Sequence, residues 1–286
     1  MTVAVFDARA CILGEGPLWH PLRRQLFWCD IMGKRLLTRD ADGPRDWGFD
    51  RHVSAAGWID ADTLLLATET DLARLSLVDG RAERLVALEA DTPHTRSNDG
   101  RADPLGGFWI GTMGKNAEPG AGSLYRFWRG ELRPLRDGLT IPNATSFAPD
   151  GRTAYFADTA AHIVWRIPLD ADGWPEAAWE VFLDHRDSGI NPDGAVVDAE
   201  GHLVVAEWGG ARVARYAPTG DLVEEIALPV PQPSCPALGG AGLSTLFVTT
   251  ARQGLPGDAM DAAPLSGATL SIETGWRGQE EHRVTP

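Results

Sequence analysis

Three oxygen-bearing side chains lie in short motifs rich in proline and glycine: Glu15, Asn143 and Asp193. Glu15 is flanked by two glycines, Asn143 follows Ile-Pro, and Asp193 stands between Pro and Gly. Carboxylate and amide oxygens are the ligands that hard divalent cations prefer, and two carboxylates balance the charge of one such ion. Brought together, the three would hold one divalent cation and leave positions open for water. Each one alone also fits an ordinary turn residue that bonds its own backbone.

A second motif, Arg96-Ser97-Asn98-Asp99-Gly100, combines a guanidinium with an amide. Arg96 offers a planar fork of donors, and Asn98 offers both a donor and an acceptor, so the pair suits a polyhydroxylated ligand. The alternative is an ordinary Asn-Asp-Gly turn. The usual serine-hydrolase, zinc-protease, Walker and dinucleotide motifs are all missing from the sequence.

These residues need a fold that brings distant segments together, and the sequence contains a repeat that predicts one. A turn of Asp, Pro and Gly is followed by a short β-rich run, a polar gap and a second run. Six copies can be recognised, at residues 17–39, 56–77, 99–127, 143–167, 193–216 and 235–272. This spacing, roughly 40 to 50 residues, is typical of four-stranded propeller blades.

The sequence therefore predicts an all-β fold: a six-bladed β-propeller, formed by one domain over residues 1–286, with four-stranded antiparallel blades around a central channel. The run at residues 2–6 would pair with the last blade and close the ring. A β-sandwich with regular hairpins is the alternative. Helix is nearly absent, and residues 176–183 are expected to be irregular or briefly helical. Equivalent points of different blades meet around a channel, so the three oxygen donors would converge there.

The net charge limits the possible binding partners, and the cysteines indicate the cellular compartment. The formal net charge is −14, which argues against nucleic acid or an anionic membrane and favours a cation. The first ten residues lack a signal-peptide pattern, and no stretch reaches the roughly 18 apolar residues of a transmembrane helix. Three widely spaced cysteines fit buried thiols in a reducing compartment. We expect a cytoplasmic monomer with a small-molecule substrate.

The ordered set of motifs resembles the SMP-30/gluconolactonase/LRE-like family, in its regucalcin-like, bacterial sugar-lactonase form. The motifs that carry the resemblance are Leu13-Gly14-Glu15-Gly16-Pro17-Leu18-Trp19, Arg96-Ser97-Asn98-Asp99-Gly100, Gly111-Thr112-Met113-Gly114, Ile141-Pro142-Asn143, Pro149-Asp150-Gly151-Arg152, Pro192-Asp193-Gly194 and Thr249-Thr250-Ala251-Arg252. The resemblance implies a propeller that binds one divalent ion (Ca²⁺, Zn²⁺, Mg²⁺ or Mn²⁺). It also implies hydrolysis of an aldonolactone, such as gluconolactone, galactonolactone, arabinonolactone or xylonolactone, to the aldonic acid.

The resemblance also implies roles for particular residues. Glu15, Asn143 and Asp193 would bind the metal, and Arg96 and Asn98 would contact the substrate.

Three further interpretations concern the chemistry and the sugar. Asn116 stands where regucalcin-like members carry a glutamate that helps to hold the sugar, so we expect it to bind substrate with a changed preference. Glu207 could add an acidic group nearby. A metal polarises the carbonyl and acidifies water, and Asp193 would also act in catalysis by accepting the proton of the attacking water.

Two other functions remain open from the sequence. One is a phosphotriesterase or paraoxonase-like esterase that would use the metal ion in the same way, and the other is a non-catalytic calcium-binding propeller. Fold alone does not decide between them.

Overall fold

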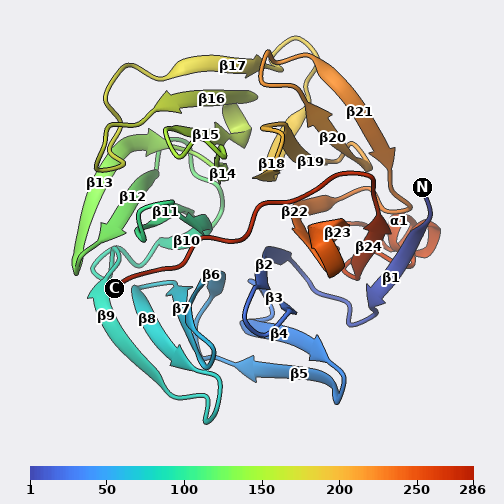
Figure 1. Ribbon diagram of the computed structural model, residues 1–286. Coiled ribbons are helices and arrows are strands. Elements are labelled where there is room, and N and C mark those ends of the chain that lie inside the picture. The colour runs from blue at the N-terminus through green and yellow to red at the C-terminus, as the bar shows by residue number, and fades with distance from the viewer.

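The computed structural model describes residues 1–286, and six four-stranded antiparallel sheets stand in a ring around a central channel (Figure 1). The prediction of a six-bladed β-propeller is confirmed. From the channel outward, blade 1 consists of β2 (Gly14–His20), β3 (Gln25–Asp30), β4 (Arg35–Asp40) and β5 (Gly43–Gly48). Blade 2 consists of β6 (Val53–Asp60), β7 (Thr63–Thr68), β8 (Asp71–Ser76) and β9 (Ala82–Ala87). Blade 3 consists of β10 (Thr95–Ala102), β11 (Phe108–Gly114), β12 (Gly122–Trp128) and β13 (Glu131–Leu139).

Blades 4 to 6 complete the ring, and the N-terminal strand closes it. Blade 4 consists of β14 (Pro142–Phe147), β15 (Thr153–Asp158), β16 (Ile163–Pro168) and β17 (Glu180–Asp184). Blade 5 consists of β18 (Asn191–Val197), β19 (Leu203–Trp208), β20 (Arg212–Tyr216) and β21 (Leu222–Ala227). Blade 6 consists of β22 (Pro233–Gly239), β23 (Thr245–Thr250), β24 (Thr269–Glu273) and β1 (Val3–Asp7). β1 pairs with β24 in the order that the sequence predicted, so first and last segments share one blade.

Helix is scarce, as expected. The one α-helix, α1 (Gly257–Ala262), has six residues, and two 3₁₀ turns cover Thr159–Ala161 and Ala241–Leu243. Residues 176–183 were expected to be irregular or briefly helical. Residues 176–179 are irregular, as expected, whereas Glu180 begins β17, which pairs with β16 as the outer strand of blade 4. No helix is long and apolar enough to span a bilayer.

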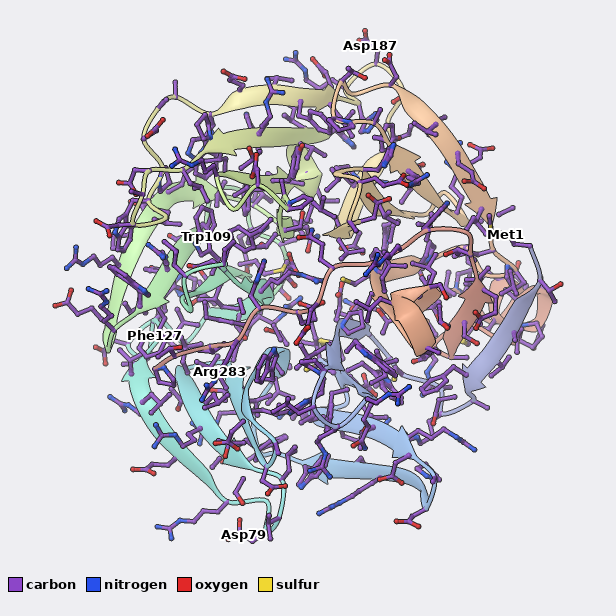
Figure 2. All side chains as sticks on the ribbon, in the orientation of Figure 1. Met1, Asp79, Trp109, Phe127, Asp187 and Arg283 are labelled. Atoms are coloured by element: carbon purple, nitrogen blue, oxygen red, sulfur yellow. The ribbon has the colours of Figure 1, made fainter.

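The core consists of six apolar clusters, and each joins two neighbouring blades. Successive side chains of a strand point to opposite faces of its sheet. In β11, Phe108 and Ile110 therefore pack toward blade 2, while Trp109 between them packs toward blade 4. Trp109 lies among the packed blades, whereas Asp79 and Asp187 project from the rim (Figure 2). The predicted burial of all three cysteines is confirmed, and none forms a disulfide.

All six innermost strands contain a register shift near their first residues. The shifts fall at Glu15/Leu18, Val53/Ala55, Ser97/Gly100, Asn143/Ser146, Pro192/Ala195 and Pro233/Cys235. A bulge of this kind bends the strand and turns a side chain away from the regular alternation. Here it directs polar side chains into the channel at one mouth.

The C-terminal segment, residues 278–286, crosses the ring and ends beside blades 2 and 3 (Figure 1). Gln279 donates to the carbonyls of Phe147 and Val197, at the ends of β14 and β18. Glu281 forms a buried ion pair with Arg101 of β10, at 2.6 Å between Oε1 and Nη1. Because these contacts lie at the far ends of the inner strands, the segment closes the channel opposite the bulged mouth.

Candidate metal and active site

A cavity of about 380 Å³ opens at the bulged mouth of the channel, within the usual size range of small-ligand sites. Five of the residues singled out in the sequence line it: Glu15, Arg96, Asn98, Asn143 and Asp193. They come from the innermost strands of blades 1, 3, 4 and 5. Segments up to 178 positions apart, from Glu15 to Asp193, thus meet as the repeat predicted.

The glycines beside the carboxylates are required by the geometry. Gly16 has φ of +53°, and a Cβ there would lie 2.5 Å from the carbonyl oxygen of Ser54. Its backbone N–H donates to Glu15 Oε2 at 3.0 Å. A Cβ on Gly194 would lie 2.3 Å from the sulfur of Cys235. The glycines therefore let the bulges fit against neighbouring blades, which explains why the acidic residues occur in Glu-Gly and Asp-Gly pairs.

Buried negative charge dominates the electrostatics of the cavity. Glu15, Asp193 and the adjoining Asp99 are each at least 94% buried. Burial, followed by the charge of Asp99, raises the pKa of Glu15 to about 8. Burial, followed by the charge of Glu15, raises the pKa of Asp193 well above its ordinary value. Burial also raises the pKa of Asp99. Three carboxyl groups thus compete for a compensating cation.

Arg96 is the one basic side chain in the cavity wall. Burial lowers its pKa to about 10, so it stays charged near neutral pH. One guanidinium cannot neutralise three carboxylates. A divalent cation would supply the missing charge, and oxygens of Glu15, Asn143 and Asp193 are a donor set that suits one. The residues present therefore fit such an ion.

The amide groups of the cavity are fixed by hydrogen bonds. Arg96 Nη1 donates to Asn98 Oδ1 at 2.8 Å, and Asn98 Nδ2 donates to Asn143 Oδ1 at 2.9 Å. Asn143 Nδ2 in turn donates to the hydroxyl of Thr159 at 2.8 Å. The substrate-binding candidates and the metal-binding candidates are therefore parts of one network.

Asn116 lies outside the cavity wall, although Met113 and Ala117 on either side of it line the cavity. It is exposed, and its side chain donates to Glu118 Oε1 at 2.9 Å. Its backbone N–H donates to the other oxygen of Glu118 at 3.0 Å. The structure thus places Asn116 on the rim, beside a carboxylate that the sequence analysis did not single out.

Glu207 is buried but does not line the cavity either. Its Oε1 accepts from the hydroxyl of Tyr216 at 2.8 Å, and its Oε2 accepts from Nε of Arg212 at 2.5 Å. Both carboxylate oxygens are thus engaged within blade 5. The neighbouring Trp208 contributes to the cavity wall instead.

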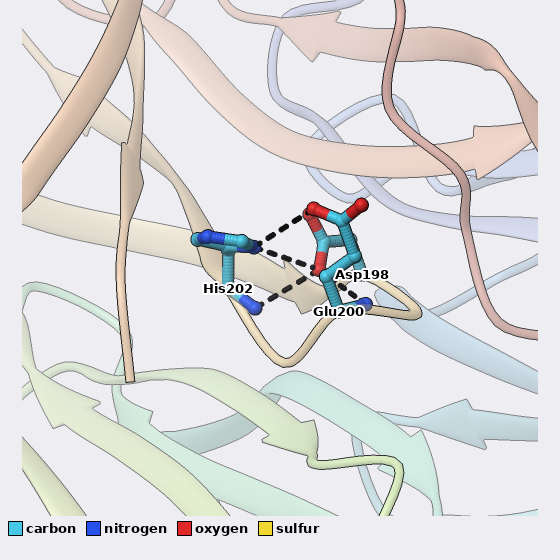
Figure 3. Close-up of side chains that lie close together, drawn as sticks. All are labelled: Asp198, Glu200 and His202. Carbon is cyan, nitrogen blue, oxygen red and sulfur yellow. Dashed lines mark hydrogen bonds and ion pairs between the residues drawn. The ribbon is translucent and has the colours of Figure 1, made fainter. Parts of the chain in front are cut away.

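A second acidic group, Asp198, Glu200 and His202, lies at the far end of blade 5 (Figure 3). Arg215 already fills the space between them. Its Nη2 lies 2.5 Å from Asp198 Oδ2, 2.9 Å from Glu200 Oε2 and 3.0 Å from His202 Nδ1. The guanidinium supplies the positive charge that a metal would bring, so this group is an internal ion-pair cluster.

Six cavity residues escaped the sequence analysis: Ala117, Thr159, Trp208, Gln232, Gln253 and Gly254. Gln232 Nε2 donates to the carbonyl of Gln253 at 3.2 Å, which joins two segments of blade 6. These residues lie outside the recognised motifs. Thr159 follows β15, Trp208 ends β19 and Gln232 precedes β22, so only the fold brings them to the mouth.

The fold and this cavity define a class: six-bladed propellers with a small-ligand site of carboxylate and amide oxygens at one channel mouth. The chain belongs to the SMP-30/Gluconolactonase/LRE-like family, whose region matches residues 13–252, so the family resemblance of the motifs is confirmed.

Three similar proteins cover nearly the whole chain. L-arabinolactonase of Azospirillum brasilense is 37% identical over 279 residues, covering 95% of this chain and 91% of the relative. The 6-deoxy-6-sulfogluconolactonase of Pseudomonas putida is 32% identical, covering 94% of each chain. The crystal structure of a calcium-binding protein, regucalcin, from Agrobacterium tumefaciens strain C58 superposes with a TM-score of 0.96. It is 36% identical and covers 99% of this chain and 97% of that chain.

Proposed function

We propose that the protein hydrolyses a sugar-derived lactone to the corresponding aldonic acid, with one divalent metal ion held by Glu15, Asn143 and Asp193. The observation that carries the proposal is the meeting, in one cavity of about 380 Å³, of this donor set with Arg96 and Asn98. Relatives named as lactonases of an arabinose-type sugar and of a sulfogluconolactone support the substrate class. The calcium-binding relative supports a divalent ion, which we propose to be Ca²⁺, Zn²⁺, Mg²⁺ or Mn²⁺.

The residues divide the reaction between binding and proton transfer. A bound divalent ion supplies Lewis acidity toward the carbonyl oxygen and favours ionisation of water. Arg96 and Asn98 hold the hydroxyls of the ring through charged and neutral hydrogen bonds. Asn116, on the rim, contacts the part of the sugar that projects from the cavity.

Asp193 is the proposed catalytic base. Its carboxylate accepts a proton from water as the water oxygen attacks the carbonyl carbon. The bond from that carbon to the ring oxygen then breaks, and the proton passes to the ring oxygen, which leaves a hydroxy acid. General-base help of this kind is worth about 10²–10⁴-fold.

The test is a panel of aldonolactones with a pH indicator, using chelator-stripped protein with and without Ca²⁺, Zn²⁺, Mg²⁺ or Mn²⁺. We expect metal-dependent acid release above the spontaneous rate on at least one sugar lactone. Asp193→Asn keeps an oxygen donor but loses the proton acceptor, so its turnover should fall by about 10²–10⁴-fold. A flat panel from folded protein would reject lactone hydrolysis. Phosphotriester turnover would then indicate the esterase function, and calcium binding without turnover the non-catalytic one.

A further inference from the structure

Four hydrogen bonds near the cavity form a continuous chain that runs from blade 3 through blade 4 to blade 5. Arg96 donates to Asn98, Asn98 donates to Asn143, and Asn143 donates to Thr159. Thr159 Oγ1 completes the chain by donating to the carbonyl oxygen of Pro192 at 2.6 Å. Pro192 immediately precedes Asp193, so the chain links one proposed ligand to the residue beside another.

The direction of these hydrogen bonds is fixed by groups that can only donate or can only accept. The carbonyl of Pro192 can only accept, so the hydroxyl hydrogen of Thr159 is committed to it. The oxygen of Thr159 must then accept from the NH₂ group of Asn143. This contact leaves the amide oxygen of Asn143 facing Asn98 and the cavity.

The other end of the chain gives the same assignment. Asn98 Nδ2 also donates to the carbonyl of Pro142 at 2.9 Å, which can only accept. Arg96 can only donate, so it must meet the amide oxygen of Asn98. Asn143 Oδ1 therefore receives one hydrogen bond and keeps a second lone pair for a cation.

Thr159 is the single protein partner that holds the NH₂ end of Asn143. Asn143 is 2% exposed, so water has little access to replace that partner. Without the hydroxyl, the amide loses one of the two contacts that distinguish its ends, and only the hydrogen bond from Asn98 to its oxygen still opposes rotation. A rotation of the amide by half a turn would then present NH₂ hydrogens, which repel a cation.

We propose that Thr159 is a positioning residue, which fixes the amide oxygen of Asn143 toward the cation and joins this proposed ligand to the backbone beside Asp193. The inference rests on the proposed metal site. Partners that orient metal ligands in this way typically contribute 10–100-fold to metal affinity.

The test uses the full-length protein and measures Ca²⁺ and Mn²⁺ affinity by titration calorimetry after chelator treatment. Thr159→Val removes the hydroxyl at nearly constant volume and should weaken binding by about 10–100-fold. Thr159→Ser keeps the hydroxyl and should restore affinity to within a few-fold of the wild type.

The matched control is Thr38→Val in blade 1. Thr38 is buried, accepts from an amide nitrogen of Gln25 at 2.8 Å and donates to the carbonyl of Leu26 at 2.6 Å. Thr38→Val thus removes the same two kinds of hydrogen bond as Thr159→Val, one accepted from an amide and one donated to a carbonyl. Because Thr38 lies outside the cavity, this variant should leave the cation affinity unchanged.

The outcomes separate the two claims. Wild-type protein that binds neither ion would reject the metal site and this inference with it. Wild-type binding with unchanged affinity in Thr159→Val would reject the positioning role alone. Equal losses in Thr159→Val and Thr38→Val would also reject it, because the effect would then be one of general stability.

Discussion

The buried carboxyl of Glu15 makes the stability of the metal-free protein depend on pH in a defined direction. Burial raises its pKa from the ordinary value of 4.5 to about 8 in the folded state. A carboxyl whose pKa is higher in the folded state than in the unfolded state makes its full contribution to stability below the pKa of the unfolded state. This contribution is lost as pH rises toward the folded pKa. The metal-free protein should therefore lose stability from this group between about pH 4.5 and 8.

Glu15→Gln removes the titrating group and keeps the shape of the side chain. Each pH unit between the two pKa values costs about 1.4 kcal/mol, so ionisation of Glu15 in the unfolded state costs roughly 3 kcal/mol of stability at pH 7. In chelator, the advantage of Glu15→Gln over the wild type should grow from nearly zero at pH 4.5 to roughly 3 kcal/mol at pH 7.

The assay is urea unfolding of both proteins in chelator, followed by tryptophan fluorescence from pH 4.5 to 8. Taking the difference between the two proteins cancels the titration of shared groups that Glu15 does not influence. The charge of Glu15 raises the pKa of Asp193 in the wild type alone, so Asp193 adds to the difference in the same direction. Added Ca²⁺ should reverse the order, because the wild type alone keeps the complete donor set. Parallel stability curves for the two proteins across this range would refute the reasoning about buried charge.

Three further predictions test the surroundings of the site. Binding of Ca²⁺ at pH 7 should release protons, because the raised carboxyl pKa values leave the metal-free site protonated; calorimetry in buffers of different ionisation enthalpy would show this, and buffer-independent heats would contradict it. Arg96→Lys keeps the charge but loses the planar set of guanidinium donors, so kcat/KM for the lactone should fall by roughly 10-fold or more while Ca²⁺ affinity stays within a few-fold of the wild type. An unchanged kcat/KM would exclude a contact between Arg96 and the substrate. Glu281→Gln leaves Arg101 buried without its partner and should lower the free energy of unfolding in urea by about 3 kcal/mol. Glu131→Gln, in an exposed ion pair, should lower it by at most about 1 kcal/mol, and equal losses would show that the C-terminal segment is not held by the Glu281–Arg101 pair.

The blades and their central residues could be predicted because they repeat. The run Leu64-Leu65-Leu66-Ala67 and its counterparts recur with similar spacing, and a repeated unit that cannot bury itself alone must stack on its neighbours. The polar residues at the start of each copy then had to meet around the channel. Glu15 and Asp193 also carried a local signal, since the adjacent glycines are required by the bulges.

Residues outside the repeat could not be placed in this way. Thr159 lies in a 3₁₀ turn after β15, and its contact with Asn143 depends on the path of that turn. The resemblance indicated Asn116 as a substrate contact but not its place on the rim of the cavity, beside Ala117 with its φ of 56°. The C-terminal segment bonds to blades far away in sequence, and nothing in its composition indicates those partners.

Metal dependence of lactone hydrolysis tests the central claim most directly. The measurement compares acid release from an arabinonolactone and a gluconolactone by chelator-stripped wild type and Glu15→Gln, each before and after addition of Ca²⁺, Mn²⁺ or Zn²⁺. The account predicts that one of these ions restores turnover to the wild type and gives little or none to Glu15→Gln. Hydrolysis that persists in chelator, or equal recovery by both proteins, would contradict it.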